Sequence, residues 1–367
     1  MCGAAIASPA ADPLEESDKD TREARRVQLP ATALPCAFAA AGALTVCLLR
    51  MPIARTVHLL DIPDSRRKFH ARITPLVGGL AVFPAIALAC VEAVSGGAPD
   101  AAVAILYAVV FGFFLIGYAD DRIEVRPSRR LLMTLALFAG LVLMSPHLMP
   151  PDFRFGGVAV PLGAGALALL AIVGAAGALN AINMADGQNG LCPGLLLIWL
   201  AFLAAKLGPG WSEAAIIAGA GLAVVLAFNL AGLVFLGDIG AYGIGAFVIG
   251  LMLAGAGSGA IDHGQIVAVM TVPVVDCVWL MLERRGRGRS PFEPDRQHLH
   301  HILRHAVGVL SMPLYLAVAG LGTLAAMAGG WAALGAIVGQ AAFVAVFRLL
   351  GRRMADPETS PPAPRSA

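Results

Sequence analysis

Residues 101–122 read AAVAILYAVVFGFFLIGYADDR. The first part of this stretch is apolar for nearly the ~20 residues that a transmembrane helix needs. It then ends abruptly in the charged residues Asp120, Asp121 and Arg122. Charged groups near a membrane are costly, so those that are present are functional candidates. The same arrangement, an apolar segment followed by a dense polar cluster, recurs along the chain and decides the expected fold.

The composition is that of a membrane protein. Of the 367 residues, 58% are hydrophobic and 14% are charged, with a mean hydropathy of +0.78. A soluble domain carries about 25% charged residues. The net charge of +2 gives no reason to expect a nucleic-acid partner, and the six cysteines are scattered without metal-type or disulfide-type spacing.

Similar apolar segments lie on both sides of residues 101–122. We therefore predict an all-α polytopic membrane protein with about eleven transmembrane helices. The predicted helices start near Ala31, Thr74, Ala101, Arg130, Val158, Leu191, Ser212, Tyr242, Gly264, Val307 and Trp331. We expect a transmembrane domain at 31–350. The polar residues 1–30 and the proline-rich residues 351–367 are predicted to be disordered tails.

The distribution of Lys and Arg predicts the orientation. The loops at 52–73, 119–130 and 283–305 carry most of the basic residues, whereas Arg154 and Lys206 are the main ones on the opposite side. Cytoplasmic loops are enriched in Lys and Arg. This places the basic loops in the cytoplasm, the N-terminus in the periplasm and the C-terminus in the cytoplasm.

Five polar clusters each follow an odd-numbered apolar segment. They lie at 61–79, 120–121, 180–190, 237–238 and 294–301. If every segment crosses the membrane, all five clusters emerge on the same side. Clusters that are far apart in the sequence can therefore converge on one site.

Asp120 and Asp121 are neighbouring carboxylates at a helix end. Such a pair repels, which raises one pKa or requires a cation. Oxygen ligands of this kind suit Mg²⁺ shared with substrate phosphates. The alternative is a solvated helix end.

The cluster at 180–190 carries several amide and carboxylate side chains. Asn180 and Asn183 share one face of a helix, and Asp186 follows three residues later. Gly187 and Gly190 permit the tight backbone with which a loop approaches a ligand. A helix cap followed by a turn would explain the glycines but not the polar side chains.

The last two clusters add a further acid and several cations. Asp238 lies between Gly237 and Ile239, where it is either another oxygen ligand or part of a capped turn. Residues 294–301 contain three histidines next to Arg296. A zinc site would need a complementary Cys/His set, so we favour phosphate contacts over metal binding for this loop. A basic loop that only sets topology is the alternative.

Together the clusters supply carboxylates for Mg²⁺, cations for phosphate and glycine turns for close approach. This combination is typical of phosphoryl transfer. Its position at one edge of a membrane domain predicts one lipid substrate and one soluble phosphorylated substrate.

With these motifs in this order, the chain resembles the polyprenyl-phosphate N-acetylhexosamine-1-phosphate transferases (glycosyltransferase family 4). The resemblance runs from about Asp61 to His301 and is nearest to the branch that initiates O-antigen and enterobacterial common antigen. It implies transfer of an N-acetylhexosamine-1-phosphate, with GlcNAc-1-phosphate preferred, from a UDP-sugar to undecaprenyl phosphate, with release of UMP. It also implies Mg²⁺ as cofactor (Mn²⁺ as substitute), the bacterial inner membrane, a cytoplasm-facing site, an O-antigen-like pathway, and compatibility with a homodimer.

The resemblance also assigns roles to individual residues. Asp120 would act on the lipid phosphate as a base or, alternatively, as a nucleophile. Asp121 and Asp186 would be further catalytic carboxylates, and Asp238 would bind Mg²⁺ with Asp121. The expected substrate-binding residues are Lys68, Asn183, Asn189, Phe235 (stacking on uracil), Arg296, His298, His300 and His301.

Asn189 departs from one branch of the family. Enzymes that make lipid I carry an aspartate at the corresponding position, so Asn189 argues against a phospho-MurNAc-pentapeptide transferase. A membrane transporter is the alternative from another class. Transporter sites usually lie near the bilayer midplane on broken helices, whereas these polar residues lie at one edge.

Overall fold

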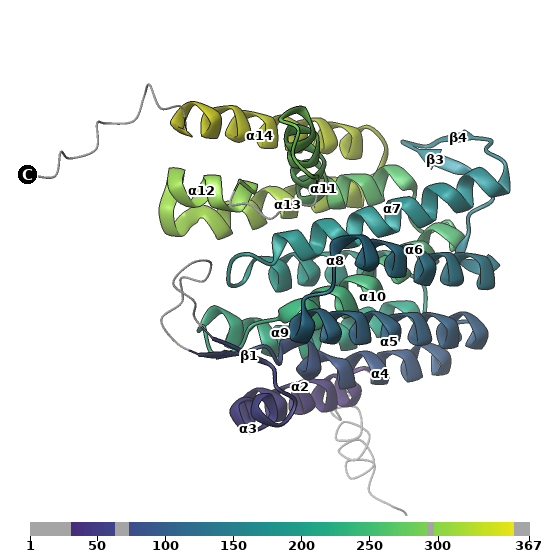
Figure 1. The fold of residues 1–367 in the computed structure, drawn as a ribbon. Helices are drawn as coiled ribbons and strands as arrows, with labels where there is room; N and C mark the ends of the chain where they lie inside the picture. Colours follow the sequence, from purple (N-terminus) through teal and green to yellow (C-terminus); the bar gives the residue numbers. More distant parts are fainter. Residues whose placement is uncertain (1–30, 63–72, 292–296, 356–367) are drawn as a thin grey trace, which may run out of the picture.

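The computed structural model describes residues 31–62, 73–291 and 297–355. Lys68 and Arg296, two of the predicted substrate-binding residues, lie outside these ranges, as do residues 1–30 and 356–367 of the predicted tails. Figure 1 shows a bundle in which most helices lie side by side along one direction. The protein is therefore mainly helical, as predicted.

Thirteen α-helices and four short strands form the described part of the chain. The helices are α2 (Ala33–Leu48), α3 (Arg50–Thr56), α4 (Gly78–Ser95), α5 (Asp100–Ile123), α6 (Pro127–Met144), α7 (Ala164–Ala185), α8 (Leu191–Lys206), α9 (Trp211–Leu230), α10 (Gly237–Ser258), α11 (His263–Gly286), α12 (Leu299–Val307), α13 (Ser311–Ala328) and α14 (Gly330–Ala355). The strands are β1 (Leu60–Asp61), β2 (Thr74–Pro75), β3 (Phe153–Phe155) and β4 (Val158–Val160). Short 3₁₀ turns at Pro146–Leu148 and Gly308–Leu310 complete the list.

Within the described residues, nine helical segments are long and apolar enough to cross a membrane, with α12 and α13 counted together as Leu299–Ala328. The pair α2 and α3 would add a tenth, but it is bent by 72°. Helix α8 is apolar and, at 16 residues, shorter than a usual span. The protein is thus a multi-pass membrane protein. Each of the eleven predicted segments contains a helix, while the count of eleven spans and the orientation stay predictions.

Two predicted helix starts were wrong. Val158 begins strand β4, which pairs with β3 in an antiparallel hairpin, and α7 starts only at Ala164. Alternating side chains and the Gly156–Gly157 turn, both at positive φ, favour a hairpin here. Helix α10 starts at Gly237, before the predicted start at Tyr242, because its first polar residues belong to the helix and not to a loop.

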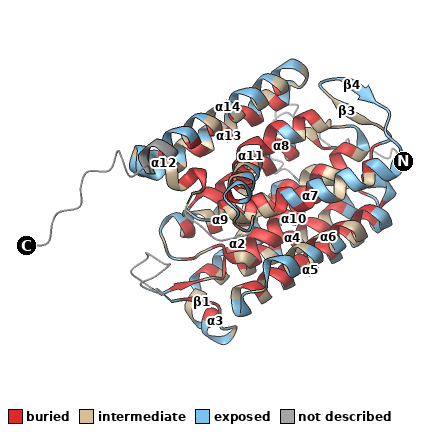
Figure 2. Ribbon diagram, turned by 45° about the horizontal axis from the view of Figure 1, so that its top comes forward, coloured by how far each residue is buried: buried red, intermediate tan, exposed pale blue. Residues whose placement is uncertain are grey.

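Helix α10 occupies the centre of the bundle. It packs against α4, α5, α7 and α8 and is buried along nearly its whole length (Figure 2). Small residues allow this close packing: Gly243 lies against the ring of Phe114, and Gly250 lies against Leu106. By contrast, α6 and α14 expose many apolar side chains, as expected of helices that face lipid.

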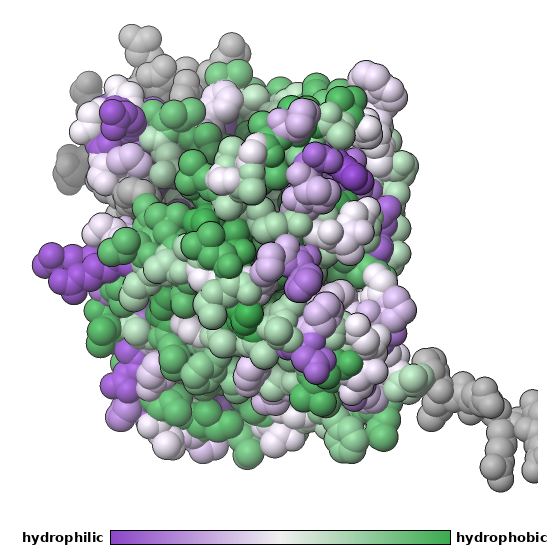
Figure 3. Space-filling model, turned by 90° about the vertical axis from the view of Figure 1, so that its right-hand side faces the viewer, coloured by the Kyte–Doolittle hydropathy of each residue, from purple (hydrophilic) through white to green (hydrophobic). Residues whose placement is uncertain are grey.

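The two ends of the bundle differ. Strands β3 and β4 lie at one end, and the β1–β2 hairpin and α12 lie at the other (Figure 1). Figure 3 faces the end with β3 and β4, where hydrophobic side chains alternate with scattered hydrophilic ones. The described residues of the polar clusters lie at the opposite end.

Candidate active site

Described residues of the polar clusters meet where helices end or begin at that one end of the bundle. Helix α5 ends just after Asp121, α7 ends just before Asp186, and α10 begins at Gly237 beside Asp238. The fifth cluster opens α12. Because α10 packs against both α5 and α7, the convergence expected from the sequence takes place.

Asp121 joins α5 to the start of α10. Its Oδ1 accepts the N–H of Asp238 and its Oδ2 accepts the N–H of Ile239, both at 3.0 Å. The first N–H groups of a helix lack partners within the helix and carry partial positive charge. Asp121 therefore caps α10 from a neighbouring helix.

Gly117 makes this approach possible. A Cβ at Gly117 would lie 2.5 Å from the Cα of Ile239, so a larger side chain would push α5 and α10 apart. The Gly78–Gly79 pair does the same for α4: a Cβ at Gly79 would lie 2.7 Å from the Cα of Gly240. The glycines of these motifs serve the close approach of backbones.

Asp120 is buried and held from two sides. Its Oδ1 accepts the N–H of Val125 at 2.7 Å, and its Oδ2 forms an ion pair with Arg130 of α6. The carboxylates of Asp120 and Asp238 also interact electrostatically with each other. Sequence reasoning treated Arg130 only as part of a basic loop. The short connection through Pro127, which turns the chain back toward Asp120, was the available signal.

Asp186 lies directly after α7 and interacts electrostatically with Asp121. Burial, and secondarily the negative charge of Asp121, raise the pKa of the Asp186 carboxyl well above its usual range. One turn earlier on α7, Asn183 lies close to Tyr242 of α10. The structure thus brings together Asp120, Asp121, Asp186 and Asp238, with Asn183 beside them.

The donor set fits Mg²⁺ in its usual mode. Mg²⁺ prefers oxygen ligands and is commonly held by one or two carboxylates together with waters and substrate phosphates. Among the described residues, no three His, Cys, Asp or Glu side chains are arranged to hold a metal by themselves. Asp238 and Asp121 are therefore suited to a cation that substrate phosphates help to bind.

Phe235 lies in the loop before α10, where it pairs with the first polar cluster. Its N–H donates to the carbonyl of Pro75 at 2.9 Å, and its carbonyl accepts the N–H of Gly78 at 3.0 Å. Gly79 donates in the same way to Leu236 at 3.1 Å. The segment that carries Phe235 is thus fixed at the start of α4, next to the cap of α10.

The loop from Gly187 to Gly190 is held by a residue that sequence reasoning missed. The buried Asn229 accepts the N–H of Gly190 at 2.6 Å and donates to the carbonyl of Val234 at 3.0 Å. Gly190 has a φ of +83°, which favours glycine. Asn189 is exposed beside this link, near Gly232 and the loop of Phe235.

The histidines lie next to the carboxylates because His300 packs against Gly187, the residue after Asp186. His300 is buried, and its Nε2 has no hydrogen-bond partner among the described residues. This atom lies against Gly187, where any Cβ would collide with the imidazole ring. The rings of His300 and His298 stack with centroids 5.8 Å apart, and that of His301 lies 4.2 Å from His300. The histidine loop therefore adjoins the loop of Asp186.

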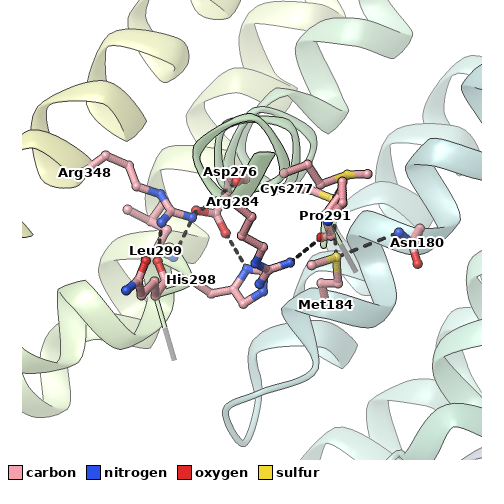
Figure 4. A network of polar contacts seen from close by, with 11 residues as sticks. Asn180, Met184, Asp276, Cys277, Arg284, Pro291, His298, Leu299 and Arg348 are labelled. Atoms are coloured by element: carbon pink, nitrogen blue, oxygen red, sulfur yellow. Dashed lines mark hydrogen bonds and ion pairs between the residues drawn. The ribbon is translucent and has the colours of Figure 1, made fainter. Parts of the chain in front are cut away.

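Sequence reasoning also missed Asp276, which contacts His298, and Arg348, which contacts Asp276. Asp276 of α11 lies 3.1 Å from Nδ1 of His298 and forms an ion pair with Arg348 of α14 (Figure 4). Both lie inside apolar helices, and a single acid or base within a span is the signal that could have found them.

Comparison with known proteins matches the part of the chain that carries these residues. The model of the family described as glycosyl transferase family 4 matches residues 103–256, a range that contains all four clustered aspartates. The undecaprenyl-phosphate alpha-N-acetylglucosaminyl 1-phosphate transferase of Escherichia coli (strain K12) is 31% identical over 268 residues, which are 69% of this chain and 71% of that protein.

Other bacteria carry similar proteins. The transferase of the same name from Yersinia pestis is 29% identical over 291 residues, covering 76% of this chain and 78% of its own. The decaprenyl-phosphate N-acetylglucosaminephosphotransferase of Mycobacterium leprae is 30% identical over 287 residues, or 65% and 68% of the two chains. This chain belongs to glycosyl transferase family 4, among the polyprenyl-phosphate hexosamine-1-phosphate transferases.

Proposed function

We propose that this protein transfers GlcNAc-1-phosphate from UDP-GlcNAc to undecaprenyl phosphate and releases UMP. The observation that carries the proposal is the meeting of Asp120, Asp121, Asp186 and Asp238, from α5, α7 and α10, at one end of a membrane bundle. The relatives named above support the acceptor lipid and the sugar. Their names do not favour a lipid I-type transferase or a transporter.

In the reaction, an oxygen of the lipid phosphate attacks the β-phosphorus of the UDP-sugar. The bond from that phosphorus to the bridging oxygen breaks, and UMP leaves with the electron pair. Mg²⁺, held with the help of Asp238 and Asp121, would supply charge neutralisation for the diphosphate. Asp120, oriented by Arg130, would take up the proton of the lipid phosphate. A covalent intermediate on Asp120 is the alternative chemistry.

The other residues would bind the donor. Phe235 would stack on uracil and Asn189 would contact its edge, because both lie in the loops that flank the carboxylates. His298, His300 and His301 would contact the diphosphate or sugar, and the unpartnered Nε2 of His300 beside Gly187 supports this role. Asn183 would hold the carboxylate group in place through Tyr242. Lys68 and Arg296 are proposed as further phosphate contacts.

The proposal includes the setting of the reaction. The site would face the cytoplasm of a bacterial inner membrane, where UDP-sugars are available, and the product would start an O-antigen-like polysaccharide. The basic loops at 119–130 and 283–305 support this orientation. A homodimer stays a prediction.

UMP release tests the proposal. Purified protein would be mixed with undecaprenyl phosphate, Mg²⁺ and one of several UDP-sugars. We expect release that requires both lipid and Mg²⁺ and is fastest with UDP-GlcNAc. Folded protein that releases no UMP with any sugar would refute the assigned reaction.

A further inference from the structure

The carboxylate of Asp276 makes contacts that a purely structural buried acid does not need. Its Oδ2 lies 3.1 Å from Nδ1 of His298, and its Oδ1 accepts the N–H of Leu299 at 3.0 Å. His298 is the residue just before α12, and Leu299 is the first residue of that helix. Asp276 thus caps α12 from α11 and at the same time holds the imidazole of His298 (Figure 4).

Arg348 of α14 holds Asp276 in turn. Its guanidinium, only 2% exposed, forms an ion pair with Oδ1 of Asp276 and donates to the main-chain oxygen of Asp276 at 3.2 Å. A second hydrogen bond goes to the main-chain oxygen of Gln297. A buried charge requires such a partner, so Asp276 is the carboxylate that pairs with this cation. Helix α14 therefore secures both Asp276 and the residue before His298.

An ionised Asp276 determines the state of the His298 ring. A carboxylate only accepts hydrogen bonds, so Nδ1 of His298 carries the proton between the two groups. Nε2 is then the ring nitrogen that can meet a ligand. Fixing one nitrogen of a histidine by a carboxylate is how proteins set the orientation and tautomer of a functional imidazole.

The position of His298 affects the rest of the site. Its ring stacks at 5.8 Å on His300, and Nε2 of His300 lies against Gly187, next to Asp186. A shift of the His298 ring would move His300 relative to the carboxylates. The contacts of Asp276 therefore extend from the C-terminal helix to the centre of the site.

We propose that Asp276, anchored by Arg348, is a positioning residue that orients His298 for contact with the phosphates or sugar of the donor. The inference rests on the proposed transferase function. Neither residue touches the substrate in this account. His298 carries the effect of Asp276 on the donor, so this effect disappears when His298 can no longer use Nε2.

The alternative is that Asp276 merely ties α11 to α14. The chain offers a matched control for this explanation. Gln340 of α14 is also buried, and its Nε2 donates to the carbonyl of Ala268 in α11 at 2.8 Å. Gln340 thus joins the same two helices without touching His298. Gln340→Met would weaken that junction and leave the histidine loop in place.

The test is a double-mutant cycle. Asp276→Asn keeps the size of the side chain and removes the charge. His298→Asn keeps an N–H donor near the position of Nδ1 and removes Nε2. The two single variants, the double variant, Gln340→Met and the wild type would be compared for KM and kcat with UDP-GlcNAc and with undecaprenyl phosphate. Thermal unfolding would report stability separately.

We expect Asp276→Asn to lower kcat/KM for UDP-GlcNAc by about tenfold or more, with the KM for the lipid unchanged. In the His298→Asn background the same substitution should change kcat/KM by less than about twofold. Gln340→Met should lower the unfolding temperature and leave kcat/KM unaltered. Equal losses from Asp276→Asn in both backgrounds would overturn the inference, as would a loss of activity in Gln340→Met equal to that in Asp276→Asn.

The wild type separates this inference from the proposed reaction. If the wild type turns over and Asp276→Asn behaves like it, only the positioning role fails. If the wild type releases no UMP, the reaction is wrong, and the same cycle is read from the Kd of UDP-GlcNAc by calorimetry. A Kd that rises in Asp276→Asn but not in the His298→Asn background supports the positioning role, and an unchanged Kd overturns it.

Discussion

The carboxylate of Asp121 receives the backbone N–H groups of Asp238 and Ile239, each at 3.0 Å, so the last turn of α5 caps the first turn of α10. In the same way, Asp276 of α11 caps the first turn of α12. In both cases a helix start that carries site residues is fixed by an acid from another helix. The site is thus built on capped helix ends, which hold their side chains more rigidly than loops would.

The cap predicts a combined loss of stability and activity in Asp121→Ala. Loss of a capping side chain costs about 1 kcal/mol, and here it also frees the backbone next to Asp238. The matched control is Asp262→Ala, because Asp262 caps α11 through the N–H of Gln265 at 2.8 Å, in the connection between α10 and α11. Thermal unfolding and UMP release would be measured for both. We expect similar destabilisation but a loss of turnover only in Asp121→Ala; full turnover in that variant would contradict its place in the site.

We expect that full activity requires Arg130, because this residue holds Asp120 in place. Its ion pair with Asp120 holds the acid that is assigned to the lipid phosphate. Arg130→Met should lower kcat by about a hundredfold, by analogy with the loss of one oriented electrostatic partner, and Arg130→Lys should recover part of it. Arg129→Met, at the preceding exposed position, is the control and should keep normal turnover. A normal kcat in Arg130→Met would show that Asp120 works without this partner.

The helices and the site carboxylates were predictable from the sequence because each rests on a local pattern. Apolar segments of membrane length indicate helices whatever their neighbours, and polar residues at their ends are costly without a function. The hairpin at Val158 was missed because its strands are only three residues long and as apolar as a helix. The start of α10 was missed because its capping partner, Asp121, lies far along the chain. Asp276, Arg348 and Asn229 were missed for the same reason, since each gains its role only from a contact between distant helices.

Removal of the metal should stop turnover. If Asp238 and Asp121 hold Mg²⁺ on the substrate phosphates as proposed, chelation by EDTA should abolish UMP release, and Mg²⁺ or Mn²⁺ should restore it. Asp238→Ala should shift the Mg²⁺ concentration for half-maximal rate upward by at least about tenfold. Asp152→Ala, in the loop before β3 at the opposite end of the bundle, should titrate like the wild type. An unchanged Mg²⁺ titration in Asp238→Ala would remove Asp238 from the metal site.

The close packing of α5 on α10 gives the last prediction. A Cβ at Gly117 would lie 2.5 Å from the Cα of Ile239, where backbone has to move. Gly117→Ala should therefore destabilise the protein by about 1–3 kcal/mol, as overpacking does, and should displace the cap that Asp121 forms. Gly140 of α6 has no heavy atom of the described chain within 4 Å of such a Cβ, so Gly140→Ala should be neutral or stabilising, because alanine favours a helix over glycine by about 1 kcal/mol. Unfolding temperature and UMP release of the two variants would be compared. Equal behaviour of the two would mean that α5 and α10 can separate without loss of the site, and that the glycine is not what sets their distance.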